Sequence, residues 1–234
     1  MVTSVPEINH TIPAEVKTVA AEVALSSGYQ AAADNQWSEN NVKSILIVGV
    51  GGQGTLLASR VLAQALLMAG ADVKVSEVHG MAQRGGSVVT HVRYGPRVFA
   101  PLVQMGQVDY ILAFEKLEAI RWLPYLKKGG WLIVNDQAID PLPVLTGAAK
   151  YPEEIPEKIS RLVENLLVLD ATPMAEEVGN VKATNIVLLA VLAGLLDLTE
   201  ETWERALEKA VPAKVLEVNK EAFKKGYAFI TNKK

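Results

Sequence analysis

The sequence predicts an α/β protein, a three-layer Rossmann-like domain whose sheet is mostly parallel and covered by helices on both faces. Two observations carry this prediction. From residue 42 onward, short apolar runs alternate with longer segments of helical periodicity, a pattern typical of parallel strands joined by helical crossovers. In addition, the run Ile45–Val48 leads into four glycines within six positions, as a buried strand does when it turns directly into a helix.

Each element follows from a local pattern. Apolar runs rich in β-branched residues predict strands near Ile45–Val48, Val73–Val78, Tyr110–Phe114, Trp131–Asn135 and Leu166–Leu169. Apolar residues at helical spacing predict helices over Thr55–Ala69, Lys116–Leu126, a short segment after Thr172, Asn185–Leu196, Glu200–Ala210 and the charged carboxy-terminal stretch. The sequence Lys127-Lys128-Gly129-Gly130 marks the end of the second helix, because glycine readily terminates helices.

One segment departs from the parallel pattern. Ser87–Tyr94 alternates with period two, and Gly95-Pro96 then turns the chain into Arg97–Leu102. This predicts a β-hairpin formed by the two segments, added to the sheet in antiparallel fashion.

The domain organisation is one domain with an extension. Residues 1–41 are dominated by alanine, glutamate, asparagine and serine, with Pro6 and Pro13 near the start. We expect this part to be an N-terminal extension that is either mobile or docked on a partner. Residues 42–234 are enough for a single α/β domain with a substantial core.

Composition excludes several classes of protein. The net charge is −3 and no long cluster of Lys or Arg occurs, so nucleic acid is not an expected partner. The longest apolar run, Ile186–Leu196, is too short to span a bilayer, and the start lacks a secretion signal; we expect a cytoplasmic protein. Without cysteine the chain offers no thiolate for an iron–sulfur cluster or zinc ribbon, and its scattered histidines predict no metal site.

The first glycine-rich segment predicts a phosphate-binding loop. Gly49, Gly51 and Gly54 match the spacing G-x-G-x-x-G, and the predicted helix starts directly afterwards. The free N–H groups and the positive dipole end of that helix favour a bound anion. The alternative is that the glycines only tighten the turn from strand to helix.

A second polar segment follows the next predicted strand. Residues Glu77–Ser87 combine an acid, an imidazole, an amide, a guanidinium and three glycines. Because the two segments follow consecutive strands of one sheet, we expect them to form a common site.

Two enzyme classes fit parts of this pattern. Glu77 stands where an NAD-binding domain carries the acid that contacts the ribose, but no catalytic His/Asp or Tyr/Lys set for hydride transfer follows. The doubled glycine Gly51-Gly52 resembles the nucleotide loop of sulfur-carrier-protein adenylyltransferases. Arg84 agrees with that class, whereas its acidic pair and its cysteines are missing. A free-standing NAD- or ATP-using enzyme and a nucleotide-sensing or architectural module therefore stay open as alternatives.

Taken together, the two segments closely resemble one known family. Gly-Val-Gly-Gly-Gln-Gly at 49–54 and Val-Ser-Glu-Val-His-Gly-Met-Ala-Gln-Arg-Gly-Gly-Ser-Val at 75–88 resemble the gamma module of 2-oxoacid:ferredoxin oxidoreductases. The similarity is strongest to the beta subunits of the indolepyruvate branch. It extends through Ala113-Phe114-Glu115, Tyr125–Gly130, Lys182-Ala183-Thr184-Asn185 and Glu217-Val218-Asn219, and residues 1–41 depart from it.

The resemblance implies a reaction and a division of labour. Such complexes convert an aryl 2-oxoacid and coenzyme A (CoA) into acyl-CoA, carbon dioxide and reduced ferredoxin. The resemblance implies an alpha subunit that carries thiamine diphosphate and the iron–sulfur clusters. This chain would then hold no cofactor by itself, would contact CoA and would be inactive alone.

The resemblance also implies roles for single residues. The backbone of Gly49, Gly51, Gly52 and Gly54 would cradle a CoA phosphate, with Gln53 as an amide donor. Arg84 would pair with a phosphate or with the substrate carboxylate, and His79 and Gln83 would line the mouth of the active site.

Each of these roles has a structural alternative. Arg84 would serve equally well in a salt bridge to Glu77 at a subunit interface. His79 would bond to backbone at a strand end, and Gln83 would act as an interface donor.

Overall fold

The structure, a computed structural model, describes residues 42–79 and 85–232, and of His79 only the backbone. The predicted extension, residues 1–41, lies outside the described residues. In chain order the elements are β1 (Lys43–Val50), α2 (Thr55–Met68), β2 (Asp72–His79), β3 (Ser87–Gly95), β4 (Val108–Ala113), α3 (Lys116–Trp122), η1 (Leu123–Tyr125), β5 (Leu126–Asn135), α4 (Leu142–Leu145), α5 (Ile155–Ser160), β6 (Asn165–Leu169), α6 (Thr172–Glu177), η2 (Val181–Ala183), α7 (Thr184–Ala193), α8 (Glu200–Ala210), η3 (Ala213–Val215) and α9 (Leu216–Thr231).

The strands form one six-stranded sheet in the order β2-β3-β1-β4-β5-β6. β1, β4, β5 and β6 are mutually parallel, whereas β3 is antiparallel to both of its neighbours, β1 and β2. The mostly parallel sheet with an antiparallel addition is therefore confirmed. Because β1 and β2 flank the same antiparallel strand, they run in the same direction and their carboxyl ends lie at one edge of the sheet.

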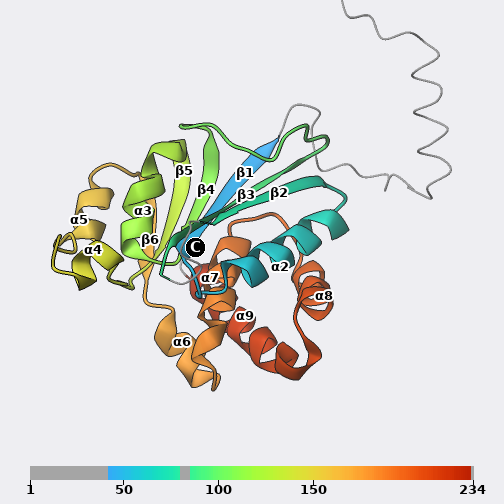
Figure 1. Cartoon of the computed structure of the whole chain (residues 1–234). Coiled ribbons are helices and arrows are strands. Elements are labelled where there is room, and N and C mark those ends of the chain that lie inside the picture. The colour runs from blue at the N-terminus through green and yellow to red at the C-terminus, as the bar shows by residue number, and fades with distance from the viewer. Residues whose placement is uncertain (1–41, 80–84, 233–234) are drawn as a thin grey trace, which may run out of the picture. The chain divides into compact units, whose positions relative to one another are not determined.

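Helices cover both faces of the sheet (Figure 1). α2, α6, α7, α8 and α9 pack on one face in a core that includes Ile45, Val92 and the entirely buried helix segment Ile186–Ala193. α3 and α5 pack on the other face, where Leu46 and Val134 are part of the core. The residues of β1 alternate between these two cores because successive side chains of a strand point to opposite faces.

The prediction that Ser87–Tyr94 forms a hairpin with Arg97–Leu102 is wrong. Arg97–Leu102 is not a strand, since β3 pairs instead with β1 and β2 on its two sides, with Val92 opposite both Ile45 and Val75. Both hydrogen-bonding edges of β3 are thus already occupied. The N–H of Val98 donates to Oδ2 of Asp72 at 2.7 Å, so this segment is bound through a side chain in place of a strand partner.

A second difference concerns the segment after α3. The helix ends at Trp122, four residues before the predicted Leu126, and the turn η1 containing Pro124 follows. Residues 127–130 belong to β5, where they accompany a register shift between Val108 and Tyr110. Gly130 allows this close approach, because a Cβ there would lie 3.0 Å from the carbonyl oxygens of Val108 and Asp109.

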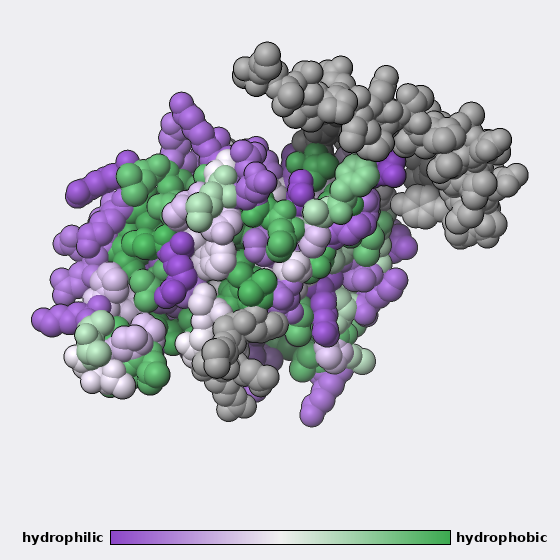
Figure 2. Space-filling view, turned by 45° about the horizontal axis from the view of Figure 1, so that its top comes forward, coloured by the Kyte–Doolittle hydropathy of each residue, from purple (hydrophilic) through white to green (hydrophobic). Residues whose placement is uncertain are grey.

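The surface mixes hydrophilic and apolar residues, as the face in Figure 2 shows. Among the described residues, Phe99, Leu102 and Met105 expose 82%, 57% and 66% of their surface within the single segment that joins β3 to β4. No helix of the described residues has both the length and the apolar character needed to cross a bilayer.

Candidate functional site

The two glycine-rich segments meet at the end of the sheet that holds the carboxyl ends of β1 and β2. The N–H of Gly51 donates to the carbonyl of Gly86 at 2.9 Å, and the N–H of Gly85 donates to the carbonyl of Gly51 at 3.4 Å. The loop after β1 is therefore held against the end of the segment that connects β2 to β3. Gln83, Arg84 and the side chain of His79 lie outside the described residues, so their predicted roles stay predictions.

Gly49 and Gly54 are closely packed against neighbouring side chains. A Cβ on Gly49 would lie 2.8 Å from Oε1 of Gln53, and a Cβ on Gly54 would lie 2.5 Å from Nδ2 of Asn185. Gly54 also has a φ of +81°, a left-handed conformation that side chains with a Cβ adopt at a cost. At Gly49 the missing Cβ thus permits close packing against the loop, and at Gly54 glycine also suits the left-handed turn into α2.

Gly52 differs from the other glycines of the loop. Its φ is +107°, it is exposed, and nothing lies within 4 Å of the place where a Cβ would stand. The N–H groups of Gly52, Gly54 and Thr55 donate to no other residue that the structure describes, and α2 has no side-chain cap. These donors and the positive end of the α2 dipole form the part of the loop that is suited to an anion.

The side chain of Gln53 is committed to the protein itself. Its Oε1 accepts from the N–H of Val50 at 2.7 Å, and its Nε2 donates to the carbonyl of Phe114 and to Oε1 of Gln137, both at 2.9 Å. The amide N–H groups of Gln53 are therefore both used. The residue fixes the loop against the ends of β4 and β5.

A pocket of about 510 Å³ opens beside this loop. It lies between the start of α2, the ends of β4 and β5 and the start of α7, and its lining residues are Gly52, Gln53, Gly54, Leu57, Phe114, Asn135, Gln137, Thr172, Val181, Lys182, Thr184, Asn185 and Leu188. Most of the polar side chains in this lining are amides. Lys182 is the charged residue of this lining, which contains no carboxylate.

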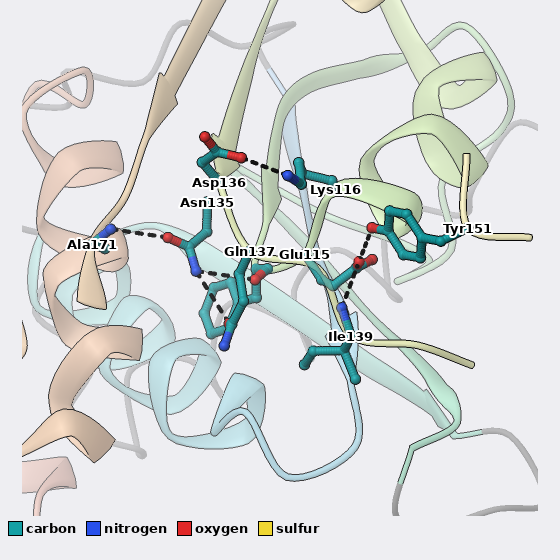
Figure 3. A network of polar contacts seen from close by, with 9 residues as sticks. Glu115, Lys116, Asn135, Asp136, Gln137, Ile139, Tyr151 and Ala171 are labelled. Carbon is teal, nitrogen blue, oxygen red and sulfur yellow. Dashed lines mark hydrogen bonds and ion pairs between the residues drawn. The ribbon is translucent and has the colours of Figure 1, made fainter. Parts of the chain in front are cut away.

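Part of the pocket lining is an ordered set of amides, of which Figure 3 shows Asn135 and Gln137. Asn135 is fully buried; its Oδ1 accepts from the N–H of Ala171 at 3.0 Å, and its Nδ2 donates to the Phe114 carbonyl and to Gln137 Oε1, both at 3.3 Å. Gln53 and Asn135 thus share the same two acceptors. Such a network rigidifies the end of the parallel strands, where ligands bind in open α/β sheets.

Asn185 joins α7 to the glycine loop. It is 3% exposed, and its Nδ2 donates to the carbonyl of Gly54 at 3.0 Å. Its Oδ1 is buried and accepts no hydrogen bond from any described residue. An acceptor left in this state costs about 1–3 kcal/mol.

A buried acidic cluster lies at the start of α3. Glu115 accepts hydrogen bonds from the Tyr151 hydroxyl and from the N–H of Ile139 at 3.2 Å (Figure 3). It also accepts one from the N–H of Glu118 at 2.9 Å. Burial is the main reason why the pKa of Glu118 is raised, and this effect outweighs the Ser87 hydroxyl and Arg121 that favour its charged form. None of these residues is in the pocket lining, so we assign the cluster to structure.

Glu77 occupies a position that argues against NAD. It lies in β2 opposite Thr90 of β3, and β3 separates β2 from β1. In NAD-binding domains the acid ends the parallel strand next to the first one. Here the neighbour of β1 on that side runs antiparallel, so the dinucleotide arrangement is not reproduced.

Sequence reasoning missed the residues outside the two glycine-rich segments. Asn135 ends the parallel strand β5, and Gln137 follows it. Lys182 lies in η2, directly before the apolar helix α7, and Asn185 is the second residue of that helix. The signal was present, since polar residues at carboxyl ends of parallel strands are the usual ligand positions. Among the described residues, no group of three or more His, Asp or Glu side chains is placed to hold a metal ion.

Comparison with known proteins places this arrangement in context. Residues 44–229 match the protein family described as pyruvate ferredoxin/flavodoxin oxidoreductase. The chain is 44% identical over 190 residues to indolepyruvate oxidoreductase subunit IorB of Pyrococcus horikoshii, which covers 78% of this chain and 93% of that protein. It is 27% identical over 182 residues to the common gamma subunit of pyruvate/ketoisovalerate oxidoreductases of Pyrococcus furiosus, covering 76% and 92%.

The fold is also found among solved structures. The crystal structure of pyruvate oxidoreductase subunit PORC from Thermotoga maritima matches with a TM-score of 0.61 at 25% identity. The match covers 81% of this chain and 97% of that one.

Proposed function

Because this chain belongs to the pyruvate ferredoxin/flavodoxin oxidoreductase family, we propose that it is the subunit without iron–sulfur clusters in a cytoplasmic 2-oxoacid:ferredoxin oxidoreductase complex. The substrate is an aryl 2-oxoacid such as indolepyruvate. In the reaction the bond to the carboxylate carbon breaks and carbon dioxide leaves. The acyl group forms a thioester with the sulfur of CoA, the thiol proton is released, and the electron pair passes to ferredoxin.

The pocket beside the α2 loop is the observation that carries this proposal. CoA is a polyanion. The pocket combines Lys182, a lining free of carboxylates, and the N–H groups of Gly52 and Gly54, which donate to no other residue that the structure describes. Opposite charge and these backbone donors favour a phosphate at this place. The N–H of Gly51 is bonded to Gly86 and the amide of Gln53 is in use, so Gly52 and Gly54 are the better phosphate ligands of the loop.

The redox cofactors belong to a partner in this proposal. The sequence contains no cysteine and therefore cannot supply the thiolates that iron–sulfur clusters require. We assign these clusters and thiamine diphosphate to an alpha subunit, where thiamine diphosphate supplies the electron sink for decarboxylation. The exposed apolar residues Phe99, Leu102 and Met105 agree with a chain that packs against another protein.

The choice of an aryl substrate rests on the relatives. The identity is 44% to a protein named for indolepyruvate and 27% to one named for pyruvate and ketoisovalerate. In this proposal His79, Gln83 and Arg84 contact the substrate or CoA at the mouth of the active site, and Glu77 supports them from β2.

Reconstitution tests this function. The chain is purified alone, together with a cysteine-rich alpha subunit from the same source, and the alpha subunit is purified alone. We expect CoA-dependent reduction of ferredoxin or of a viologen with indolepyruvate in the mixture, and none with either chain by itself. Turnover by this chain alone, or tight binding of NAD to it, would contradict the proposal.

A further inference from the structure

In the described part of the chain, α3 and α5 cover one side of their face of the sheet and leave the side toward β2 open. α3 packs against β1, β4 and β5, and α5 packs against β6. In Figure 1 both helices lie toward the β4, β5 and β6 side of the sheet. The edge strand β2 is packed by α2, which belongs to the opposite face. Antiparallel strands such as β2 and β3 tolerate an open face when its side chains are polar.

The segment between β3 and β4, residues 96–107, lies on this open side. It contacts His91, whose position in β3 is opposite Leu46 of the core beneath α3. Four hydrogen bonds hold the segment, from the Val98 N–H to Asp72 Oδ2, from Arg93 Nη1 to the Ala100 carbonyl, from the Val103 N–H to His91 Nδ1 and from the Gly106 N–H to the Pro124 carbonyl. The backbone is thus ordered before any partner binds, which removes part of the entropic cost of binding.

This segment displays apolar side chains. Phe99, Leu102 and Met105 recur at every third position, and each of them exposes more than half of its surface. Val78 of β2 is 49% exposed and points to the same face of the sheet as His91. We call Val78, Phe99, Leu102 and Met105 the connector surface. A group of exposed apolar residues of this kind is typical of a protein–protein contact.

The charges beside the connector surface that stay available to a partner are positive. Residues 96–107 contain Arg97 and no carboxylate, and Arg93 reaches the segment from β3. The guanidinium carbon of Arg97 lies 4.9 Å from the ring centroid of Phe99. Neither arginine forms an ion pair with a carboxylate that the structure describes, and Asp72 is paired with Lys74. Aromatic, methionine and arginine side chains together are the composition that protein interfaces favour.

We propose that the connector surface, with Arg93 and Arg97 at its border, is where this chain docks on the alpha subunit of the complex. The facing surface of that subunit is apolar at its centre and carries carboxylates at its rim. A guanidinium binds a planar carboxylate through two parallel hydrogen bonds, and a protein partner holds its carboxylates in fixed positions. This inference rests on the proposed function and adds to it the surface that joins the two subunits.

The first test places a charge on the connector surface of the whole chain. Phe99→Asp and Met105→Asp are compared with Leu142→Asp and Leu145→Asp, two leucines of α4 that are 72% and 70% exposed and lie outside the connector surface. The measurement is the Kd of the complex with the purified alpha subunit, by sedimentation velocity at a series of concentrations without oxygen. Thermal unfolding checks that each variant is folded, which we expect because the replaced side chains are exposed.

We expect Phe99→Asp and Met105→Asp each to raise the Kd about a hundredfold, because each variant removes an apolar anchor and buries an unpaired charge. Leu142→Asp and Leu145→Asp should bind as the wild type does. Unchanged Kd values in both connector variants, or an equal loss in the α4 variants, would overturn the inference. Self-association of the isolated chain that the connector variants abolish would overturn it as well, since the surface would then join two copies of this chain.

The second test measures the rate of association at several salt concentrations. Arg97→Met is compared with Arg161→Met, an exposed arginine directly after α5. The wild-type rate should fall as salt is added, and Arg97→Met should associate about threefold more slowly at low salt with a weaker dependence on salt. Arg161→Met should match the wild type. If the Arg97→Met rates equal those of the wild type at every salt concentration, the acidic rim of the partner is ruled out.

A membrane is the other surface that attracts apolar and cationic side chains. The wild-type chain is therefore sedimented with vesicles of phosphatidylglycerol and phosphatidylcholine. We expect it to stay in the supernatant. Binding to the vesicles that Phe99→Asp abolishes would assign the connector surface to a lipid partner and refute docking on a protein.

Failure of the proposed function differs from failure of this inference. A wild-type chain that forms no complex with the alpha subunit contradicts the proposed function, and the inference with it. A complex that forms and turns over normally, with a Kd that does not respond to the connector variants, contradicts only the docking surface.

Discussion

Gln53 Nε2 lies 2.9 Å from Oε1 of Gln137, so the glycine loop after β1 is hydrogen-bonded to the second residue after β5. This contact crosses one intervening strand, since β4 lies between β1 and β5. It makes the shape of the loop dependent on the end of the sheet. Hydrogen bonds to the protein therefore hold the loop in place, and their contribution to the free energy of unfolding is measurable.

Replacing Gln53 should destabilise the protein. Gln53→Ala removes hydrogen bonds to Val50, Phe114 and Gln137 and leaves their partners unpaired, so we expect a loss of about 2–4 kcal/mol in the free energy of unfolding. Gln53→Glu should cost at least as much, because a carboxylate oxygen then faces two acceptors. Urea denaturation measures both, with Gln104→Ala as the exposed control. An effect of Gln53→Ala no larger than that of the control would contradict the bracing role.

Gly54 and Gly70 offer a matched pair of substitutions. Both have a φ of +81°, but a Cβ on Gly70 meets open space, whereas one on Gly54 lies 2.5 Å from Asn185 Nδ2. Gly70→Ala should lower stability by about 1 kcal/mol through backbone strain alone, and Gly54→Ala should cost clearly more. In an Asn185→Ala background the excess for Gly54→Ala should shrink. If Gly54→Ala and Gly70→Ala lower the free energy of unfolding of the wild type equally, the close contact with Asn185 adds nothing to the cost.

Tyr151→Phe should destabilise the fold without touching the pocket. The hydroxyl donates to the buried carboxylate of Glu115, and a hydrogen bond to a charged group contributes about 1.5–3 kcal/mol. Tyr125→Phe is the control, since its ring packs on Trp122 while its hydroxyl bonds to no other described residue. Thermal and urea unfolding measure the difference, and the Kd of CoA should not change. A shift in CoA affinity for Tyr151→Phe would mean that the cluster reaches the ligand site.

Glu118 should make stability depend on pH in a specific direction. Burial raises its pKa above the ordinary 4.5, so the native state keeps the proton where the unfolded chain has lost it. This contribution is fully present below pH 4.5 and is lost as the pH rises through the native pKa. Relative to Glu118→Gln, the wild type should therefore lose stability on going from pH 4.5 to pH 7. Denaturation curves at several pH values test this, with Glu164→Gln as the exposed control; a difference that grows in favour of the wild type would refute it.

Local patterns predicted most of the regular elements, because strand and helix periodicity depends on neighbouring residues. Thr55–Ala69 and Glu200–Ala210 appear as α2 and α8 with nearly the predicted bounds. The pairing of β3 escaped prediction, since its partners β1 and β2 are chosen by sheet order and not by the sequence of β3. The early end of α3 escaped as well, although Pro124 was its visible cause.

The site was predictable only where its residues are neighbours in sequence. The spacing of glycines located the loop, but it did not reveal that Gln53 is used internally. Asn185 contacts Gly54 across 131 positions, and only the folded chain shows that contact. The pocket wall contributed by η2 and α7 is for the same reason a result of the structure.

The placement of β3 has a consequence for the newly made chain. β1, with seven of its eight residues buried, pairs with β3 and β4, which are both synthesised later. While the polypeptide leaves the ribosome, this apolar strand must wait unpaired until Ser87–Gly95 has emerged, and the hairpin of β2 and β3 is then ready to receive it. Slow translation across residues 51–86 would prolong the interval in which this apolar strand is unpaired and prone to aggregate.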